Sequence, residues 1–325
     1  MKIIYHCYGG SHSSVTAAGI HLGMLAENRL PTREELMDIP YFDKTDDGDF
    51  GLIRMVGVDD DGNEVYVLGK KGMGEKFSRT LNGLARIIGV DTELIVINTM
   101  PCVNWIMMAG GYLSRRMGIL CIGRPLVVYG TRKAFPCLVK TVRECKTRIQ
   151  HSPAPVSFLG NNNSVNIVIL GATPFHHAQA AAQMLLKGAG NCESGPAQRH
   201  VGVAHDGAPV FIGRDTEGNR VYTIGLGREM ETGAKALACL VNLFAPHSRP
   251  VLITSVRVRG ETWIRMASAI KGWPGGKWLE RLVIRSIIKP QYKFIAQQAE
   301  AIKRAVEAAR SWLAAGHCAV SRQVN

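Results

Sequence analysis

Residues 60–69 read Asp-Asp-Gly-Asn-Glu-Val-Tyr-Val-Leu-Gly, and residues 216–225 repeat the pattern as Thr-Glu-Gly-Asn-Arg-Val-Tyr-Thr-Ile-Gly. The offset of 156 residues is too long for a solenoid, whose repeats run at roughly 20–50 residues, and it indicates two whole domains. Near the start of the chain the offset is 164, so the second copy is shorter by about eight residues. Further aligned pairs are 2–5 with 166–169, 93–97 with 249–253, and 126–128 with 282–284.

Strand and helix patterns alternate along each copy. In the first copy we expect strands at 2–7, 52–58, 64–68, 93–98 and 125–129, and helices at 15–25, 33–35, 75–88, 102–117 and 133–146. Asp59-Asp60-Asp61-Gly62-Asn63 reads as the turn of a hairpin, because the full ligand set of a calcium loop is missing. Thr32 is expected to cap the second helix, and a long amphipathic helix is expected at 294–315.

These elements predict two tandem Rossmann-like, mostly parallel, three-layer α/β domains, each with an inserted β-hairpin and packed together as a pseudo-dimer. The expected boundaries are 1–150 for the first repeat, 151–164 for a linker rich in Pro, Ser and Asn, and 165–325 for the second repeat.

Composition excludes several classes of protein. The 325 residues are 46% hydrophobic and 20% charged, and no apolar run approaches the roughly 20 residues of a membrane span. The chain starts with a strand pattern rather than a secretory signal, so we expect a cytoplasmic protein with no membrane contact. The eight cysteines form no CxxC pair and no zinc-ligand spacing, so we expect no metal site and mostly small buried thiols.

The net charge of +13 is uneven. Residues 1–150 hold 19 Lys and Arg against 16 acidic residues, whereas the remainder holds 20 against 10. This excess predicts either a solubilising surface or a surface for nucleic acid or another polyanion. The candidate polyanion-binding residues are Lys271, Lys277, Arg281, Arg285, Lys289 and Lys293.

The loop after the first strand carries the most suggestive chemistry. Residues 7–14, the Cys7 loop, read Cys-Tyr-Gly-Gly-Ser-His-Ser-Ser and lead into a helix whose unpaired amides attract anions. Cys7 is a candidate nucleophile and His12 a candidate proton-transfer group. A purely structural glycine turn is the alternative. The candidate ligand-binding residues of this loop are Gly9, Gly10, Ser11, Ser13 and Ser14, with the serines also expected to cap the helix.

Other loops at the same sheet edge add candidates. Residues 69–76 again join a strand to a helix, and Lys70 and Lys71 are placed to meet phosphate, although the loop matches neither standard phosphate-binding glycine motif. Asn98 and Asn104 are further ligand candidates. Arg115 and Arg116 offer cations, whereas Arg124 is expected to precede a strand and to lie at the opposite edge.

Three short strings support a resemblance. Residues 2–14, residues 110–115 and residues 123–125, together with Asn104, resemble an uncharacterised family of Firmicutes proteins, domain of unknown function 3189. The resemblance covers nearly all of 1–148 and implies a bacterial setting but no activity or cofactor. The Cys7 loop alone is also similar to the cysteine loop of sugar-phosphotransferase IIB proteins and of low-molecular-weight tyrosine phosphatases. Ser13 stands where those phosphatases have arginine.

Three functions remain open. The first, which we favour, is binding of a phosphorylated small molecule or nucleotide at the Cys7 loop, with or without phosphoryl-transfer or hydrolase activity. The second is non-enzymatic binding of nucleic acid or a polyanion by the second repeat. The third is a structural or regulatory pseudo-dimer. In the second copy Gly171 replaces Cys7 and only His176 matches His12, so any chemistry belongs to the first copy.

Overall fold

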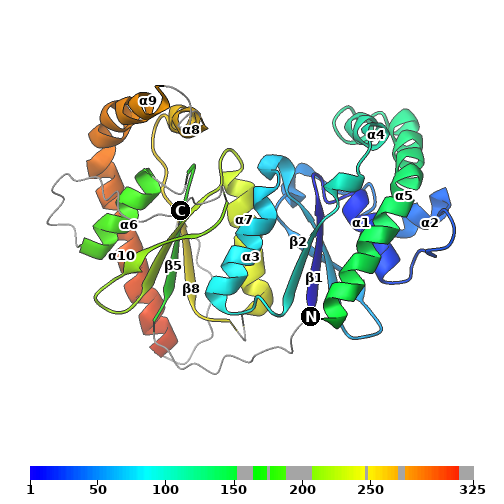
Figure 1. Cartoon of the computed structure of the whole chain (residues 1–325), viewed down its shortest axis with the longest axis horizontal. Coiled ribbons are helices and arrows are strands. Elements are labelled where there is room, and N and C mark those ends of the chain that lie inside the picture. Colours follow the sequence, from blue (N-terminus) through cyan, green and yellow to red (C-terminus); the bar gives the residue numbers. More distant parts are fainter. Residues whose placement is uncertain (152–163, 174–175, 188–206, 246–247, 270–274, 315–325) are drawn as a thin grey trace. The chain divides into compact units, whose positions relative to one another are not determined.

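The computed structural model describes residues 1–151, 164–173, 176–187, 207–245, 248–269 and 275–314 (Figure 1). The chain divides into two compact units, Met1–Gly74 with Val90–Val156, and Glu75–Gly89 with Ser157–Asn325. Helix α3 (Lys76–Ile88) therefore groups with the second unit, although it lies in the first repeat by sequence. The pseudo-dimer stays a prediction.

The first unit is built on one four-stranded sheet in the order β2-β3-β1-β4. The central strand β1 (Lys2–Cys7) runs parallel to β3 (Glu64–Gly69) and to β4 (Leu94–Asn98). Strand β2 (Ile53–Val58) is antiparallel to β3, which confirms the inserted hairpin. Because the three parallel strands end at one edge, Cys7, Gly69 and Asn98 lie near one another there.

The second unit repeats this sheet in the order β6-β7-β5-β8. Its strands are β5 (Asn166–Gly171), β6 (Val210–Arg214), β7 (Arg220–Gly225) and β8 (Val251–Ser255). The irregularity between Met55 and Gly57 in β2 recurs between Phe211 and Gly213 in β6, at the same offset of 156. Equal strand order, direction and bulge support the tandem duplication.

The hairpin turn explains why the repeated string is retained. Asp59 Oδ1 accepts hydrogen bonds from the amides of Asp61 and Asn63 at 3.0 and 2.7 Å. In the second copy, Asp215 Oδ1 accepts from the amides of Glu217 and Asn219, both at 2.9 Å. An Asp side chain that satisfies the turn amides fixes the loop, so these carboxylates are structural.

The helices of the first unit are α1 (Ser13–His21), α2 (Arg33–Asp38), α4 (Trp105–Arg115) and α5 (Leu120–Gln150), with short 3₁₀ turns at Asp47–Asp49, Lys71–Met73 and Met100–Cys102. Thr32 caps α2, as expected, through a capping box with Glu35. Helix α1 starts at Ser13 after His12 and has no side-chain cap, so the prediction that a serine caps it is wrong. It also ends four residues before Leu25.

The predicted strand at 125–129 is wrong, because these residues lie inside α5. The run Leu126-Val127-Val128 has β-branched residues, but its buried positions continue as Thr131, Phe135 and Leu138, which is a helical period. Pro125 and Pro136 are both accommodated within this helix of 31 residues. Arg124 consequently projects from a helix beside α4 rather than from the far edge of the sheet.

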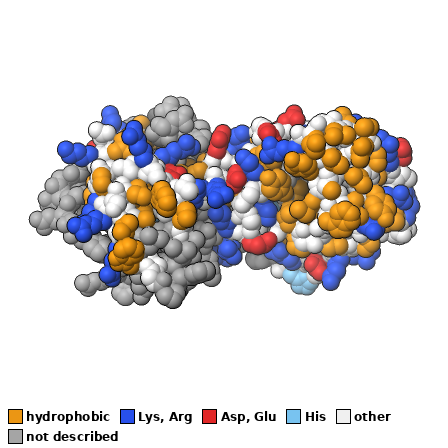
Figure 2. Space-filling model, turned by 90° about the horizontal axis from the view of Figure 1, so that it is seen from above, with side chains coloured by type: hydrophobic (Ala, Val, Ile, Leu, Met, Phe, Trp, Pro, Cys, Tyr) orange, Lys and Arg blue, Asp and Glu red, His pale blue; other side chains and the backbone are white. Residues whose placement is uncertain are grey.

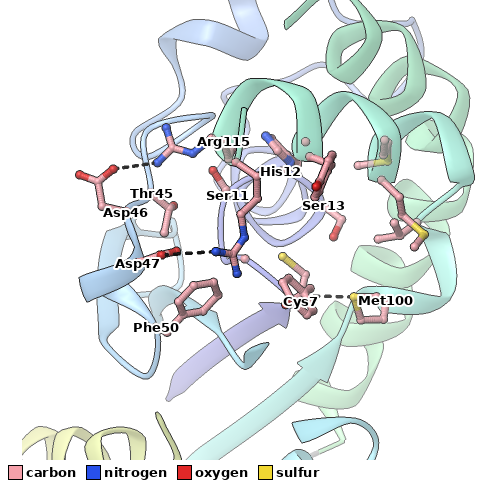
Figure 3. A pocket seen from close by; sticks show the side chains of 18 residues that line it. Cys7, Ser11, His12, Ser13, Thr45, Asp46, Asp47, Phe50, Met100 and Arg115 are labelled. Atoms are coloured by element: carbon pink, nitrogen blue, oxygen red, sulfur yellow. Dashed lines mark hydrogen bonds and ion pairs between the residues drawn. The ribbon is translucent and has the colours of Figure 1, made fainter. Parts of the chain in front are cut away.

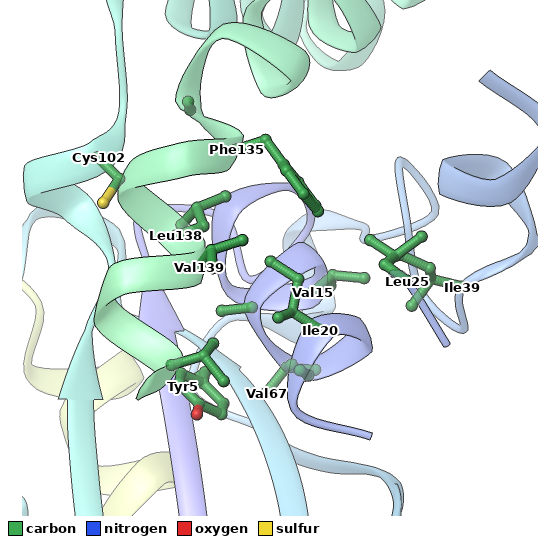
Figure 4. Packing of buried hydrophobic residues seen from close by; sticks show 14 of the residues in the cluster. Tyr5, Val15, Ile20, Leu25, Ile39, Val67, Cys102, Phe135, Leu138 and Val139 are labelled. Carbon is green, nitrogen blue, oxygen red and sulfur yellow. The ribbon is translucent and has the colours of Figure 1, made fainter. Parts of the chain in front are cut away.

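The core of the first unit lies between the sheet and the helices α1 and α5 (Figure 4). Tyr5, Val15 and Leu138 are fully buried there. The Tyr5 hydroxyl lies 2.7 Å from His21 Nδ1, and His21 Nε2 lies 3.0 Å from Asp59 Oδ2. His21 therefore ties the core to the hairpin, as expected for a structural histidine. His6 is fully buried too, and burial lowers its pKa to about 3, so it is neutral.

Two cysteines differ from the expectation of small unpaired thiols. Cys102 and Cys137 form a disulfide with a Cα–Cα distance of 5.6 Å, which links the turn after β4 to α5. Cys7 and Cys145 are buried and free, and Cys121 is exposed. Cys192 and Cys318 lie outside the described residues.

The helices of the second unit, besides α3, are α6 (His177–Lys187), α7 (Met230–Phe244), α8 (Glu261–Ala269), α9 (Gly276–Val283) and α10 (Tyr292–Ala314). Helix α10 confirms the long C-terminal amphipathic helix. Among the residues that the structure describes, no helix has the length and apolar character needed to cross a membrane.

Candidate active site in the first unit

Cys7 is the last residue of β1 and is 5% exposed. The chain turns directly after it, with Gly10 at φ +66° and packed against β3. A Cβ on Gly10 would lie 2.5 Å from the Gly69 amide nitrogen, so this position requires glycine for both its conformation and its close approach. The amides of Lys70 and Lys71 hydrogen-bond back to the carbonyls of Cys7 and Tyr8 at 2.9 Å each.

Two carbonyl groups of the Cys7 loop accept hydrogen bonds from the segment before and within β2. Gly10 O accepts hydrogen bonds from Arg54 at 2.9 Å and from Thr45 at 3.2 Å. Ser11 O accepts one from the Asp43 amide at 3.1 Å. Residues 43–54 thus occupy these two carbonyl groups, whereas amide and hydroxyl donors of the loop have other partners.

Those donors surround Cys7 Sγ. The Gly10 amide donates to Sγ at 3.1 Å, and the Ser14 hydroxyl lies 3.2 Å from it. Burial raises the pKa of the Cys7 thiol, but the donors of Ser14, Ser13 and Ser11 outweigh burial and leave this pKa lowered. A thiolate is the reactive form of cysteine, and a lowered pKa favours that form of Cys7.

His12 is held by a buried carboxylate. Its Nε2 lies 3.1 Å from Asp43 Oδ1, and the Asp43 side chain is 1% exposed. Asp43 also accepts from Ser114 Oγ at 3.2 Å and from Arg124 Nε at 2.9 Å. Burial raises the pKa of Asp43, but its partners His12, Arg124 and Ser114 outweigh burial and leave that pKa lowered. Asp43 is therefore an anion that fixes the imidazole.

A pocket of about 730 Å³ opens over the Cys7 loop (Figure 3). Its volume falls within the range of about 300–1,000 Å³ that small-molecule sites occupy. Of the predicted site residues, Cys7, Gly9, Ser11, His12 and Ser13 line it. The remaining lining residues come from residues 45–50, from the turn after β4 and from α4.

Arg115, the last residue of α4, and Arg116, which follows it, also line the pocket. Arg115 pairs with Asp46 at 3.0 Å, and Arg116 lies 3.7 Å from Asp47 (Figure 3). The carboxylates of Asp46 and Asp47 are 89% and 80% exposed, and ion pairs this open contribute about 0–1 kcal/mol. An anion entering the pocket therefore competes with them for the arginines at little cost.

The other predicted ligand residues do not line this pocket. Lys70 Nζ donates to Gly74 O at 3.0 Å and to Asn98 Oδ1 at 3.2 Å, so both side chains brace the neighbouring loop. Lys71 lies over the Phe50 ring at 5.8 Å. Asn104 caps α4 and donates to Gly130 O at 2.8 Å, which makes it structural. Gly10 and Ser14 support the site through Cys7.

Sequence reasoning missed Asp43, Thr45, Asp46, Asp47 and Phe50, all of which lie in the acidic loop before the hairpin. Their only signal was a run of carboxylates with no periodicity. Arg124 was not expected at the site, because the wrongly predicted strand at 125–129 placed it at the opposite edge of the sheet.

The second copy of the loop is filled rather than open. A Cβ on Gly171, which aligns with Cys7, would lie 3.0 Å from His177 Nε2. His177 is fully buried, and burial lowers its pKa to about 4, so a neutral ring occupies the space beside Gly171. His176 instead lies 3.2 Å from Thr173 Oγ1. Among the described residues of this loop, no cysteine stands in the place of Cys7.

The predicted polyanion residues are spread over the end of the second unit. Arg281, Arg285, Lys289 and Lys293 are exposed, on α9, the following π-helical and 3₁₀ turns, and α10. Lys277 lies in α9, and Lys271 falls outside the described residues. The described residues contain no group of three His, Cys, Asp or Glu suited to a metal ion.

The model of a family described as Protein of unknown function (DUF3189) matches residues 2–147 and 201–304. No curated protein and no solved structure matches the chain.

Proposed function

Since the chain belongs to the DUF3189 family, whose description carries no activity, we propose from the site alone that the first repeat binds a phosphorylated small molecule or a nucleotide in the pocket over the Cys7 loop. The observation that carries this proposal is the pocket that the Cys7 loop, at the start of α1, lines together with Arg115 and Arg116.

The Cys7 loop suits an anion because it leads into the start of a helix. The nine residues of α1 begin at Ser13, and the first amides of a helix have no partner within it. Ser11 gives independent support. It lines the pocket and is 4% exposed, and its Oγ has no hydrogen-bond partner in the described part of the chain. A buried hydroxyl without a partner is costly unless a ligand or water satisfies it.

Arg115 and Arg116 provide the charge that Ser13 does not. Phosphatases of low molecular weight carry an arginine at the position of Ser13, whereas here the cations reach the pocket from α4. Guanidinium groups recognise phosphate oxygens through paired donors.

A thermal-shift screen with inorganic phosphate, sugar phosphates and nucleotides tests the proposal, since a ligand of the native state raises the melting temperature. We expect stabilisation by at least one of these compounds, its reduction in Arg115→Gln and in Ser14→Ala, and its retention in Arg132→Gln, which removes an exposed charge of α5 that does not line the pocket. No stabilisation by any of them would contradict the proposal.

A second candidate function uses the second repeat. The exposed cations Arg281, Arg285 and Lys289 follow one another at four-residue spacing along the α9 region, which favours contact with a polyanion such as nucleic acid. Binding that falls steeply with salt and is lost when all three are changed to glutamate supports this candidate. If neither phosphate binding nor polyanion binding is found, a structural or regulatory role becomes the favoured hypothesis.

A further inference from the structure

Part of the pocket wall is apolar, unlike the polar and charged part described above. Apolar and aromatic side chains also line the cavity: Phe50, Met100, Val103, Met107, Met108 and Tyr112. A bare phosphate ion needs no such wall. The wall fits a ligand in which an apolar or aromatic group carries the phosphate.

This wall continues on to the outer surface. Met108 and Tyr112 line the pocket, yet 63% and 60% of these residues remain exposed, as does 75% of Trp105 on the same helix. Figure 2 shows hydrophobic side chains gathered on the face of the first unit that carries α4 and α5 in Figure 1. An aromatic group larger than a single ring therefore has apolar surface to lie on outside the cavity.

His12 lines the same cavity and has one ring nitrogen that Asp43 does not bind. Asp43 binds Nε2, and Nδ1 has no hydrogen-bond partner among the described residues. Gly111 of α4 also lines the pocket, and a Cβ there would lie 3.3 Å from His12 Cε1 and 3.6 Å from Nδ1. The glycine thus leaves room for the edge of the ring that carries Nδ1, at the side of the cavity formed by α4.

These observations place a nucleophile, a proton carrier and an unsatisfied hydroxyl around one cavity. We infer that the first repeat hydrolyses phosphate monoesters of aromatic alcohols, with Cys7 as nucleophile and His12 as proton donor and acceptor. This inference rests on the proposed phosphate site, and it adds the reaction and the class of substrate.

In the first step the Cys7 thiolate attacks phosphorus, an S–P bond forms, and the bond from phosphorus to the aryl oxygen breaks. The departing oxygen takes the Nδ1 proton of the His12 imidazolium and leaves as a phenol. In the second step water attacks phosphorus and gives one proton to His12 Nδ1, while the S–P electron pair returns to sulfur. Phosphate leaves, and both side chains regain their starting states without an oxidant or a co-reactant.

Asp43 acts as a positioning residue in this scheme. It keeps Nε2 as the donor to its carboxylate and thereby directs Nδ1 toward the cavity, in the way that a carboxylate orients the imidazole of a nucleophile–histidine pair. The Cys7 donors lower the basicity of the leaving sulfur in the second step, which favours breakdown of the phosphocysteine.

The test measures release of p-nitrophenol from p-nitrophenyl phosphate, with phosphotyrosine, a nucleoside 5′-monophosphate and glycerol phosphate as further substrates. We expect turnover of the aryl esters, at least about tenfold slower turnover of glycerol phosphate, and no turnover in Cys7→Ser. His12→Asn should lower kcat by about 10²–10³-fold. Cys121→Ser, which removes an exposed thiol that does not line the pocket, should leave turnover unchanged.

The same proteins are tested for stabilisation by inorganic phosphate, so that the two proposals fail separately. Stabilisation of wild type and Cys7→Ser without turnover of any aryl ester would overturn the catalytic inference and leave the phosphate site standing. Turnover that survives in Cys7→Ser would also overturn it, as would equal turnover of glycerol phosphate. Absence of both stabilisation and turnover would overturn both proposals. A phosphorylated Cys7 peptide after acid quench would support the covalent step.

Discussion

His12 Nε2 and Asp43 Oδ1 lie 3.1 Å apart, with the Asp43 side chain 1% exposed and bound on its other oxygen by Arg124. The carboxylate comes from a loop in which Tyr41 and Asp43 both have positive φ, at 70° and 48°. A non-glycine residue adopts this conformation at some cost, so the surrounding contacts determine it. The relationship between these two residues ties the acidic loop to the Cys7 loop.

The free energy of unfolding of Asp43→Asn tests whether Asp43 links the acidic loop to the Cys7 loop. Removing one partner of a buried, hydrogen-bonded charge cluster costs about 3 kcal/mol, and urea unfolding at pH 7 measures it. Asp38→Asn, at an exposed position of α2, is the control and should change the free energy of unfolding by less than about 0.5 kcal/mol. Equal, small effects in both variants would contradict the structural role of Asp43.

The pH dependence of the same variant has a defined sign. The pKa of Asp43 is lowered in the fold, so its contribution to stability is complete above the unfolded value of about 3.9 and is lost as the pH falls through the lower folded value. Wild type should therefore lose more stability than Asp43→Asn when the pH is lowered below about 4. Parallel acid unfolding curves for the two proteins would argue against a lowered pKa.

Alkylation reports on the Cys7 thiolate. We expect iodoacetamide to modify Cys7 faster than Cys145 at pH 7, because burial raises the pKa of Cys145, whereas the donors around Cys7 lower its pKa. Ser14→Ala should move the Cys7 reaction to higher pH, and phosphate or a nucleotide should protect it. Equal, ligand-independent labelling of these thiols, measured by peptide mass spectrometry, would count against an activated Cys7.

Gly10→Ala tests the geometry of the loop against a matched glycine. Gly10 and Gly23 have φ of 66° and 70°, but only Gly10 has backbone within 3 Å of the added Cβ, whereas nothing lies within 4 Å at Gly23. Gly23→Ala should therefore cost about 1 kcal/mol from conformation alone. Gly10→Ala should cost clearly more in urea unfolding and should slow Cys7 alkylation. A cost no larger than that of Gly23→Ala would show that the loop is not packed on Gly69.

The disulfide gives a further prediction. Cys102 and Cys137 are 35 residues apart in the sequence, and closing a loop of this length contributes about 4 kcal/mol by the chain-entropy relation. Treatment with a reductant should lower the melting temperature of the wild-type protein. The melting temperatures of Cys102→Ser and Cys137→Ser should be the same with and without the reductant. An equal response of wild type and variants would contradict the bond.

The duplication, the hairpin and the Cys7 loop could be predicted from the sequence because each has a local signal. The Asp59 turn and the Thr32 cap depend on residues only a few positions away. The helix through Pro125 could not be predicted, since a short β-branched run after proline is typical of a strand and only packing against α4 overrides it.

The rest of the site depends on contacts between distant segments. Asp43 and Arg124 are 81 residues apart in the sequence, and the Arg115 pair with Asp46 spans 69. Such pairings follow from how α4 and α5 fold back beside the sheet, which no local pattern of charges encodes. Lys70 and Asn98 were predicted at the correct sheet edge, but they bind each other instead of lining the pocket.

The most direct test of the account follows individual backbone amides by nuclear magnetic resonance during titration with inorganic phosphate. We predict saturable shifts of the amide signals of residues 9–14, together with the side-chain signals of Arg115 and Arg116, and no comparable response from residues 171–173 and 176–178 of the second repeat. Unchanged signals in residues 9–14 at saturating phosphate, or an equal response from both repeats, would contradict a phosphate site at the Cys7 loop.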